Sequence, residues 1–363
     1  MDQVRQAKNS NPIGLNGISF VEFCGETPEF YADLFGKMGM VLVGRSAGND
    51  KSLYQQGDIR FLVSHAEAQH SVLFAEAHGP CISGLGYRVK DVGQAFDWAL
   101  RNGWTQHSMT DGQKAVSVPT LTGIGGSGLY LVQCDQEEKV FEQAFPTMYQ
   151  LTEEAYRGAS LHEVDHLTHN VRQGEREKWV NLYRDSFNFT VVFELDATGI
   201  FSGMQTTAVL SPCGKFRIAI NEPTEAKSQI QEFIDEMKGE GIQHIALSSH
   251  DLYKSIAALR GAEIPFQEAS SSYYDMLDDR LPGHGENTGW LRELGILLDG
   301  EPLEGDNPKW GLLLQLFSKN LIGPVFFEFI QRKQNEGFGE GNAQALFESI
   351  ERDQLQRGSV SSN

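Results

Sequence analysis

Hydrophobic and polar positions alternate in many short segments of the chain, which is the pattern of half-buried strands. Three of these predicted strands cover residues 61–63, 115–118 and 216–220. Two longer segments, 92–100 and 230–237, carry apolar residues at helical spacing and predict helices. With roughly one helix for every three strands, the pattern favours an α+β fold over the strict alternation of a parallel sheet.

The same order of elements occurs twice along the chain. Near the start, a strand, a helix and a second strand are predicted at residues 17–23, 31–35 and 39–43. The second half repeats this order at residues 164–171, 179–183 and 187–193. Two later strands also correspond, 85–89 with 243–247 and 128–133 with 326–331. The repeat predicts two domains, 1–155 and 156–363, each long enough to bury its own core.

The two copies differ at three equivalent points, and only the second copy carries metal-binding side chains there. The first half has Phe20, Gly86 and Tyr130, where the second half has His166, His244 and Glu328. Two histidines and one carboxylate with open coordination positions are typical of a non-haem Fe(II) oxygenase. Glu328 lies in an apolar strand, where burial of an unpaired carboxylate is costly and a metal ion would remove the cost. Duplication followed by loss of one metal site explains the difference.

Two other motifs have better explanations than the chemistry they suggest. The segment His162-Glu163-Val164-Asp165-His166 matches a zinc-peptidase pattern that requires a helix. The repeat makes this segment a strand, on which His162 and His166 would lie ~13 Å apart, too far to hold one ion. On the same strand His169 points to the opposite face, which predicts either a core histidine or one that supports the site without binding the metal. Residues 123–128 match a dinucleotide-binding glycine pattern, but a strand follows them, so they indicate a hairpin turn.

Composition and charge narrow the class of function. The formal charge of −19, from 49 acidic and 30 basic residues, disfavours nucleic acid and anionic membrane surfaces as partners. No apolar run approaches the ~20 residues of a membrane span, and the polar first residues lack a signal core. The four cysteines are widely spaced, which fits reduced thiols. We therefore expect a cytoplasmic enzyme with a small-molecule substrate.

Two segments near the end of the chain are harder to assign. Residues 270–308 are rich in Gly, Asp, Glu and Tyr with little periodicity, which indicates a long ordered loop, and its Arg280, Arg292 and His284 are expected to be solvated or salt-paired. Residues 341–352 combine helix formers with apolar residues at helical spacing, and Asn342 is a candidate N-cap. We expect a helix there that docks on the rest of the chain.

Six motifs in order resemble the 4-hydroxyphenylpyruvate dioxygenase family of the vicinal oxygen chelate superfamily, over nearly the whole chain. They cover residues 165–171, 221–223, 243–247, 313–317, 327–332 and 337–342. The resemblance implies two domains of paired βαβββ modules, an open barrel in the C-terminal domain and a C-terminal helix that closes its mouth. It also implies one Fe(II) per chain on His166, His244 and Glu328, with no organic cofactor.

The resemblance further implies a substrate pocket. Its residues would be Thr206, Asn221, Gln229, Gln243, Gln315, Phe317, Phe326 and Phe338. Gln243 precedes a metal ligand on a strand, so its side chain should face away from the metal unless the strand is irregular. The family usually carries phenylalanine where this chain has Ala343, which predicts a roomier pocket at the lid.

The implied activity is conversion of 4-hydroxyphenylpyruvate and O2 to homogentisate and CO2 in tyrosine catabolism. A hydroxymandelate synthase would use the same substrate and metal triad but hydroxylate the benzylic carbon. An extradiol catechol dioxygenase would need a further histidine near the iron. A non-catalytic metal-binding protein is the alternative from another class, and it would bind the metal without converting a substrate. A homo-oligomer, dimer or tetramer, is expected.

Overall fold

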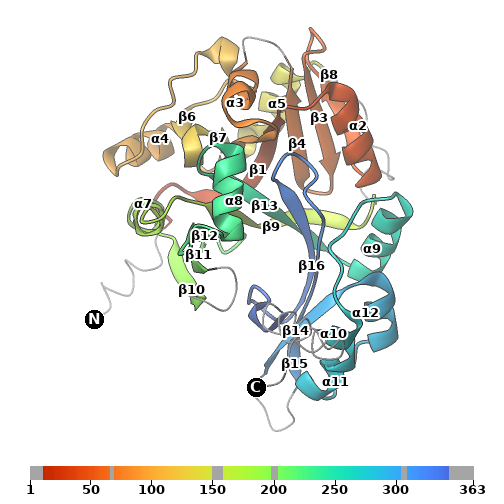
Figure 1. Ribbon diagram of the computed structural model, residues 1–363. Coiled ribbons are helices and arrows are strands. Elements are labelled where there is room, and N and C mark those ends of the chain that lie inside the picture. The colour runs from red at the N-terminus through yellow and green to blue at the C-terminus, as the bar shows by residue number, and fades with distance from the viewer. Residues whose placement is uncertain (1–10, 66–68, 149–157, 198–202, 304–308, 343–363) are drawn as a thin grey trace.

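The computed structural model describes residues 11–65, 69–148, 158–197, 203–303 and 309–342. It contains two eight-stranded sheets, one from each half of the chain, with helices around them (Figure 1). This is the α+β class that the sequence predicts. The predicted domain boundary at residue 155 lies outside the described residues and stays a prediction.

The first sheet is built around its two longest strands. Its strand order is β6-β7-β5-β1-β4-β3-β2-β8. The strands are β1 (Leu15–Cys24), β2 (Val41–Arg45), β3 (Lys51–Gln56), β4 (Ile59–Ser64), β5 (Cys81–Val89), β6 (Thr120–Thr122), β7 (Gly128–Gln133) and β8 (Thr147–Met148). The helices are α2 (Pro28–Lys37), α3 (His70–His78), α4 (Val92–Arg101) and α5 (Glu137–Ala144).

The second sheet has the same plan. Its strand order is β10-β11-β12-β9-β13-β16-β15-β14. The strands are β9 (Leu161–Asn170), β10 (Thr190–Ala197), β11 (Met204–Leu210), β12 (Arg217–Pro223), β13 (Gly241–Ser249), β14 (Leu297–Pro302), β15 (Trp310–Phe317) and β16 (Phe326–Lys333). The helices are α7 (Arg176–Phe187), α8 (Gln229–Met237), α9 (Leu252–Gly261), α10 (Ser271–Asp275), α11 (Leu277–Arg280) and α12 (Thr288–Leu294).

Strand pairing confirms the repeat. In the first half β1 pairs in parallel with β4 and antiparallel with β5, and β5 pairs in parallel with β7. In the second half β9, β12, β13 and β16 pair in the same way. Even the helix starts correspond, because Asp91 caps α4 and Asp251 caps α9 by accepting hydrogen bonds from backbone amides three residues on.

The pairing corrects one detail of the repeat. Phe20 lies opposite Gly86, and His166 lies opposite Ala246, so these two positions are the counterparts. His244 lies opposite Thr168, which places its counterpart at Gly84, opposite Glu22. The predicted equivalence of Gly86 and His244 is therefore wrong by two residues. The corresponding helix caps Asp91 and Asp251 give the correct alignment, because Gly84 and His244 each lie seven residues before the cap.

Two predicted elements also differ. Residues 115–118 form bends rather than a strand, although Ala115 and Val116 are buried inside the first sheet. Residues 270–308 are not a long loop, because they contain α10, α11, α12 and β14. The turn at 123–128 does connect the antiparallel strands β6 and β7, as predicted. No helix in the described residues is long and apolar enough to cross a membrane.

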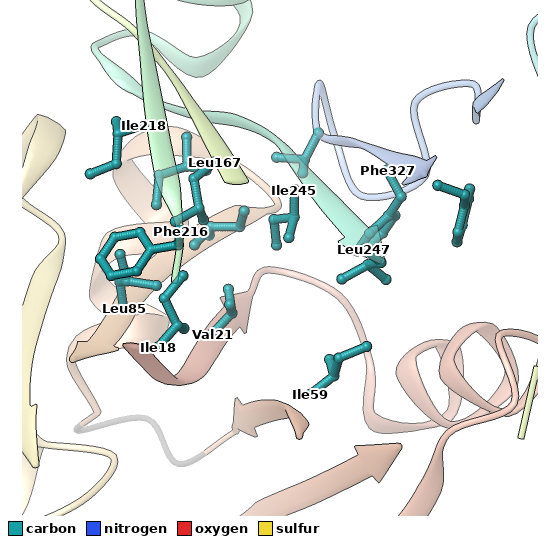
Figure 2. Packing of buried hydrophobic residues seen from close by; sticks show 14 of the residues in the cluster. Ile18, Val21, Ile59, Leu85, Leu167, Phe216, Ile218, Ile245, Leu247 and Phe327 are labelled. Carbon is teal, nitrogen blue, oxygen red and sulfur yellow. The ribbon is translucent and has the colours of Figure 1, made fainter. Parts of the chain in front are cut away.

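Alternation along the strands separates two cores. Leu167 and Ile245 point out of the second sheet toward Ile18 and Val21 of the first sheet, as Figure 2 shows. Phe327 packs between the sheets too, against Phe23 and Phe61. The neighbouring residues in sequence point into the barrel instead. In the first barrel this inner face is filled, by Phe20, Leu53, Leu62, Tyr130, Phe141 and Phe145 among others. In the second barrel it carries the candidate site.

Candidate metal centre

Three adjacent strands bring the predicted metal ligands together. His166 comes from β9, His244 from β13 and Glu328 from β16, and β13 pairs with both neighbours. One ligand atom from each residue lies within 4.8 Å of the others, and no other such group of three occurs in the described parts of the chain. Nε2 of His166 lies 3.0 Å and Nε2 of His244 3.6 Å from Oε2 of Glu328. Both imidazoles thus present Nε2 to one carboxylate oxygen.

The other nitrogen of each imidazole is held by a neighbour in sequence. Oδ1 of Asp165 accepts a hydrogen bond from Nδ1 of His166 at 2.8 Å. Oε1 of Gln243 accepts from Nδ1 of His244 at 3.2 Å. A metal-binding histidine usually donates its second N–H in this way, which leaves Nε2 as the ligand atom. The surroundings therefore fit a bound metal ion.

Two further side chains touch the cluster from inside the barrel. The Thr168 hydroxyl lies 2.9 Å from Nε2 of His244. Nε2 of Gln315 donates to Oε1 of Glu328 at 3.0 Å, and Asn342 donates to the Gln315 oxygen at 2.8 Å. Glu328 is only 3% exposed, so each of its oxygens has a defined partner in place of water.

Electrostatics concentrates one positive charge in the cluster. Burial acts to lower the pKa of His166, but the nearby carboxylates of Glu328 and Asp165 outweigh it and raise the pKa to about 9. Burial, and then the charge on His166, lower the pKa of His244. Burial opposes ionisation of Asp165, yet hydrogen bonds from Arg332 and His166 hold its pKa well below the usual range. The carboxylates of Glu328 and Asp165 thus stabilise a positive charge in the cluster. A divalent metal ion would supply that charge in place of the proton on His166.

A cavity of about 180 Å³ opens beside the cluster. Its polar lining includes Thr206 and Asn221, and the Thr206 hydroxyl donates to Oδ1 of Asn221 at 2.8 Å. Phe317 and Phe338 also line it, and the ring centroid of Phe338 lies 5.3 Å from that of His166. Such a cavity, mostly apolar with a few polar groups, is typical of a site for a small organic ligand.

The other predicted pocket residues lie elsewhere. Gln229, Gln243 and Phe326 line another cavity, of about 340 Å³, rather than the one beside the cluster. Gln229 is exposed at the start of α8. The Phe326 ring stacks on the His244 ring, with centroids 4.6 Å apart. Gln315 contacts Glu328, but it is not among the described residues that line the cavity beside the cluster. Ala343 lies outside the described residues.

Gln243 sits where its strand is irregular. The pairing of β13 with β9 shifts between Ile242 and His244. Such an irregularity allows the side chain of Gln243 to turn toward the metal side of the strand. The side-chain oxygen of Gln243 does accept a hydrogen bond from the His244 ring. A direct contact with substrate stays a prediction.

Comparison with known proteins places the chain in a family. Residues 9–154 match the model described as hydroxyphenylpyruvate dioxygenase, N-terminal, and residues 163–276 match the glyoxalase/bleomycin resistance protein/dioxygenase superfamily. The chain is 42% identical to the 4-hydroxyphenylpyruvate dioxygenase of Legionella pneumophila (strain Corby), over 97% of this chain and 99% of that one. The chain belongs to the 4-hydroxyphenylpyruvate dioxygenase family.

Two further relatives of this 4-hydroxyphenylpyruvate dioxygenase family member carry one different name and one identical name. It is 42% identical to hemolysin VllY of Vibrio vulnificus (strain CMCP6), over 96% of this chain and 97% of that one. It is 40% identical to the 4-hydroxyphenylpyruvate dioxygenase of Pseudomonas aeruginosa, over 99% of this chain and the whole of that one. The chain is therefore an enzyme of the dioxygenase class, and its family implies a metal cofactor.

Solved structures share the fold at lower sequence identity. A variant of 4-hydroxymandelate synthase from Streptomyces coelicolor matches with a TM-score of 0.75 and 22% identity, over 94% of this chain and 99% of that one. A fusion of a xylose isomerase-like barrel with a 4-hydroxyphenylpyruvate dioxygenase matches with a TM-score of 0.77 and 24% identity, over 94% of this chain and 54% of that one. Together with the superfamily match, these likenesses confirm the predicted glyoxalase-like fold.

Sequence reasoning did not find every residue around the dioxygenase centre. Thr168 shares the inner face of β9 with His166, so strand alternation would have found it. Phe193, Leu195 and Met204 also line the cavity, but they lie on β10 and β11, which carry no metal ligand to draw attention to them. Arg332 follows Glu328 on β16, and its distance from Asp165 in the sequence gave no sign of the hydrogen bonds between them.

Proposed function

We propose that this enzyme converts 4-hydroxyphenylpyruvate and O2 to homogentisate and CO2, as a step of tyrosine catabolism. His166, His244 and Glu328 would hold one Fe(II). The observation that carries the proposal is the buried cluster of two histidines and one carboxylate in the wall of a ligand-sized cavity. The names of relatives at 40–42% identity support the substrate.

Fe(II) bound there would supply the activation of O2, since three protein ligands leave positions for an α-keto acid and for O2. The side chains of the protein orient the metal ligands and the substrate. Asp165 and Gln243 hold the rings so that Nε2 faces inward. Gln315 fixes one oxygen of Glu328, which leaves the other oxygen for the metal.

The cavity lining would orient the substrate. Phe317 and Phe338 offer apolar surface for an aromatic ring and keep water away from reactive groups. Thr206 and Asn221 offer a hydroxyl and an amide that can bond substrate oxygens without adding charge. No organic cofactor is needed, because the α-keto acid supplies electrons through its own decarboxylation.

A hydroxymandelate synthase activity is the second candidate, because a protein of that name shares the fold over 94% of this chain. It would use the same ligands and substrate and differ in the carbon hydroxylated. Identity favours the first candidate, since the relatives at 40–42% include several named for the ring-hydroxylating activity.

The test is reconstitution with Fe(II) under anaerobic conditions, followed by O2 uptake, CO2 release and mass spectrometry of the product from 4-hydroxyphenylpyruvate. Glu328→Gln should abolish turnover. Glu22→Gln is the matched control, because Glu22 is an equally buried carboxyl group in the other barrel, and it should keep full activity.

Homogentisate with equimolar CO2 would support the proposal. Hydroxymandelate would select the second candidate. No O2 uptake with iron bound would refute both and leave a metal-binding role. The predicted homo-oligomer and cytoplasmic location stay predictions.

A further inference from the structure

Arg332 makes a two-pronged contact with the residue that holds a metal ligand. Its Nε donates to Oδ2 of Asp165 at 2.7 Å, and its Nη2 donates to Oδ1 at 2.8 Å. The same Oδ1 accepts the hydrogen bond from Nδ1 of His166. A bidentate pair of this kind fixes the plane of the carboxylate as well as its charge. Arg332 therefore controls which way Asp165 points, and Asp165 controls the His166 ring.

The third nitrogen of the same guanidinium group faces a different part of the molecule. Nη1 donates to the backbone carbonyls of Asn335 at 3.1 Å and Gly337 at 2.6 Å. These carbonyls begin residues 335–342, which we call the C-terminal segment. Phe338, in the middle of this segment, packs against His166 and lines the cavity. One side chain thus touches both the support of a metal ligand and the segment over the cavity.

We propose that Arg332 is a positioning residue that couples the conformation of the C-terminal segment to the orientation of His166 as a metal ligand. The inference rests on the proposed metal site. If the segment moves away, Arg332 loses two of its acceptors and its hold on Asp165 weakens. Because coupling between two sites is reciprocal, a metal ion that fixes His166 must in turn stabilise the segment.

The chain offers a matched control in Arg217. Its side chain is 9% exposed against 14% for Arg332, and it pairs with Glu336 of the same segment. Its Nη1 also makes a long ion pair with Oδ2 of Asp165, at 4.0 Å, but donates no hydrogen bond to it. Arg217→Met removes a buried cation and a contact to the segment. Unlike Arg332→Met, it leaves the bonds that orient Asp165.

The experiment compares the unaltered protein with Arg332→Met and Arg217→Met, using Co(II) as the probe. Co(II) affinity is measured by absorption spectroscopy. Hydrogen exchange with mass spectrometry follows the C-terminal segment with and without Co(II). The amides of Gly337, Phe338, Gly341 and Asn342 are hydrogen-bonded there, so changes in exchange report the segment directly.

We expect Co(II) to slow exchange of the segment in the unaltered protein and in Arg217→Met. In Arg332→Met the dissociation constant for Co(II) should rise by about 10-fold, toward the lower end of the effect of losing a direct partner of a ligand, because Arg332 acts on His166 through Asp165. Saturating Co(II) should then no longer protect the segment. Loss of a merely structural ion pair would speed exchange equally with and without Co(II).

Added methylguanidinium should restore part of the affinity of Arg332→Ala, because the shortened side chain leaves the place of the guanidinium group beside Asp165 free. Should Arg332→Met not fold, Arg332→Lys keeps the charge without the fork, and we expect it to bind Co(II) more weakly than Arg217→Met does.

Unchanged Co(II) affinity and unchanged Co(II)-dependent protection in the Arg332 variants would overturn the inference. Absence of Co(II) binding by the unaltered protein would instead refute the proposed metal site, so the two failures are distinguishable. Equal loss of coupling in Arg217→Met would also overturn the assignment, because it would make any buried cation sufficient.

Discussion

The buried carboxyl group of Glu22 should make the fold less stable at high pH. Glu22 lies on β1, inside the first barrel, at the position that Thr168 occupies in the second. It is 1% exposed, and the hydroxyls of Tyr130 and Ser64 donate to it at 3.1 and 3.3 Å. Burial raises its pKa from 4.5 to about 7, because these bonds and the charge of Lys51 offset only part of the lost hydration.

The sign of the effect follows from which state holds the proton. Below pH 4.5 Glu22 is protonated in both states and contributes nothing to the pH dependence. Between pH 4.5 and about 7 the unfolded chain ionises first, so the folded state loses stability as the pH rises. Above pH 7 the loss is complete. A pKa difference between 4.5 and about 7 amounts to about 3 kcal/mol.

Glu22→Gln keeps the shape of the side chain and removes its ionisation. Its free energy of unfolding should exceed that of the unaltered protein by up to about 3 kcal/mol near pH 8 and by little near pH 4.5. Urea denaturation of the metal-free protein at a series of pH values measures the difference. A difference that does not grow with pH, or a variant less stable than the unaltered protein near pH 8, would refute the conclusion that burial raises the pKa of Glu22.

Three further predictions follow from packing and hydrogen bonding. Phe327→Ala, at a fully buried ring between the two sheets, should lower the free energy of unfolding by about 3–5 kcal/mol in urea denaturation; a loss below 1 kcal/mol would mean that the interface repacks. Gly339→Ala should lower kcat by about 100-fold, because φ is +83° and a Cβ would overlap the Gln315 amide; wild-type kinetics would contradict this. Thr206→Val should raise KM about tenfold by leaving Asn221 without its donor, whereas Thr206→Ser should not.

The alternation of side chains along a strand explains why the sequence could predict the positions of the metal ligands. A period of two residues puts His166 and Thr168 on one face and Leu167 on the other, so the repeat alone placed the ligands on the barrel wall. The same period cannot fix how far the two halves are offset, because a displacement of two residues leaves every side chain on its own face. The predicted counterpart of His244 was Gly86 for that reason, whereas strand pairing gives Gly84.

Short elements were beyond prediction for another reason. The helices α10, α11 and α12 have five, four and seven residues, too few to be stable by their own periodicity. Packing holds them, through buried residues such as Tyr273 and Leu291. At 115–118 the apolar side chains are buried by irregular backbone, so alternation indicated burial correctly and a strand wrongly. The polar links through Arg332 join residues far apart in sequence and have no local signal at all.

We expect one iron ion to be bound by His166, His244 and Glu328. Anomalous diffraction at the iron edge, from crystals of protein reconstituted with Fe(II) without oxygen, would locate it. One peak per chain is expected, within bonding distance of both Nε2 atoms and a Glu328 oxygen. A peak in the first barrel or beside His162 and His250, or no peak in iron-loaded crystals, would contradict it.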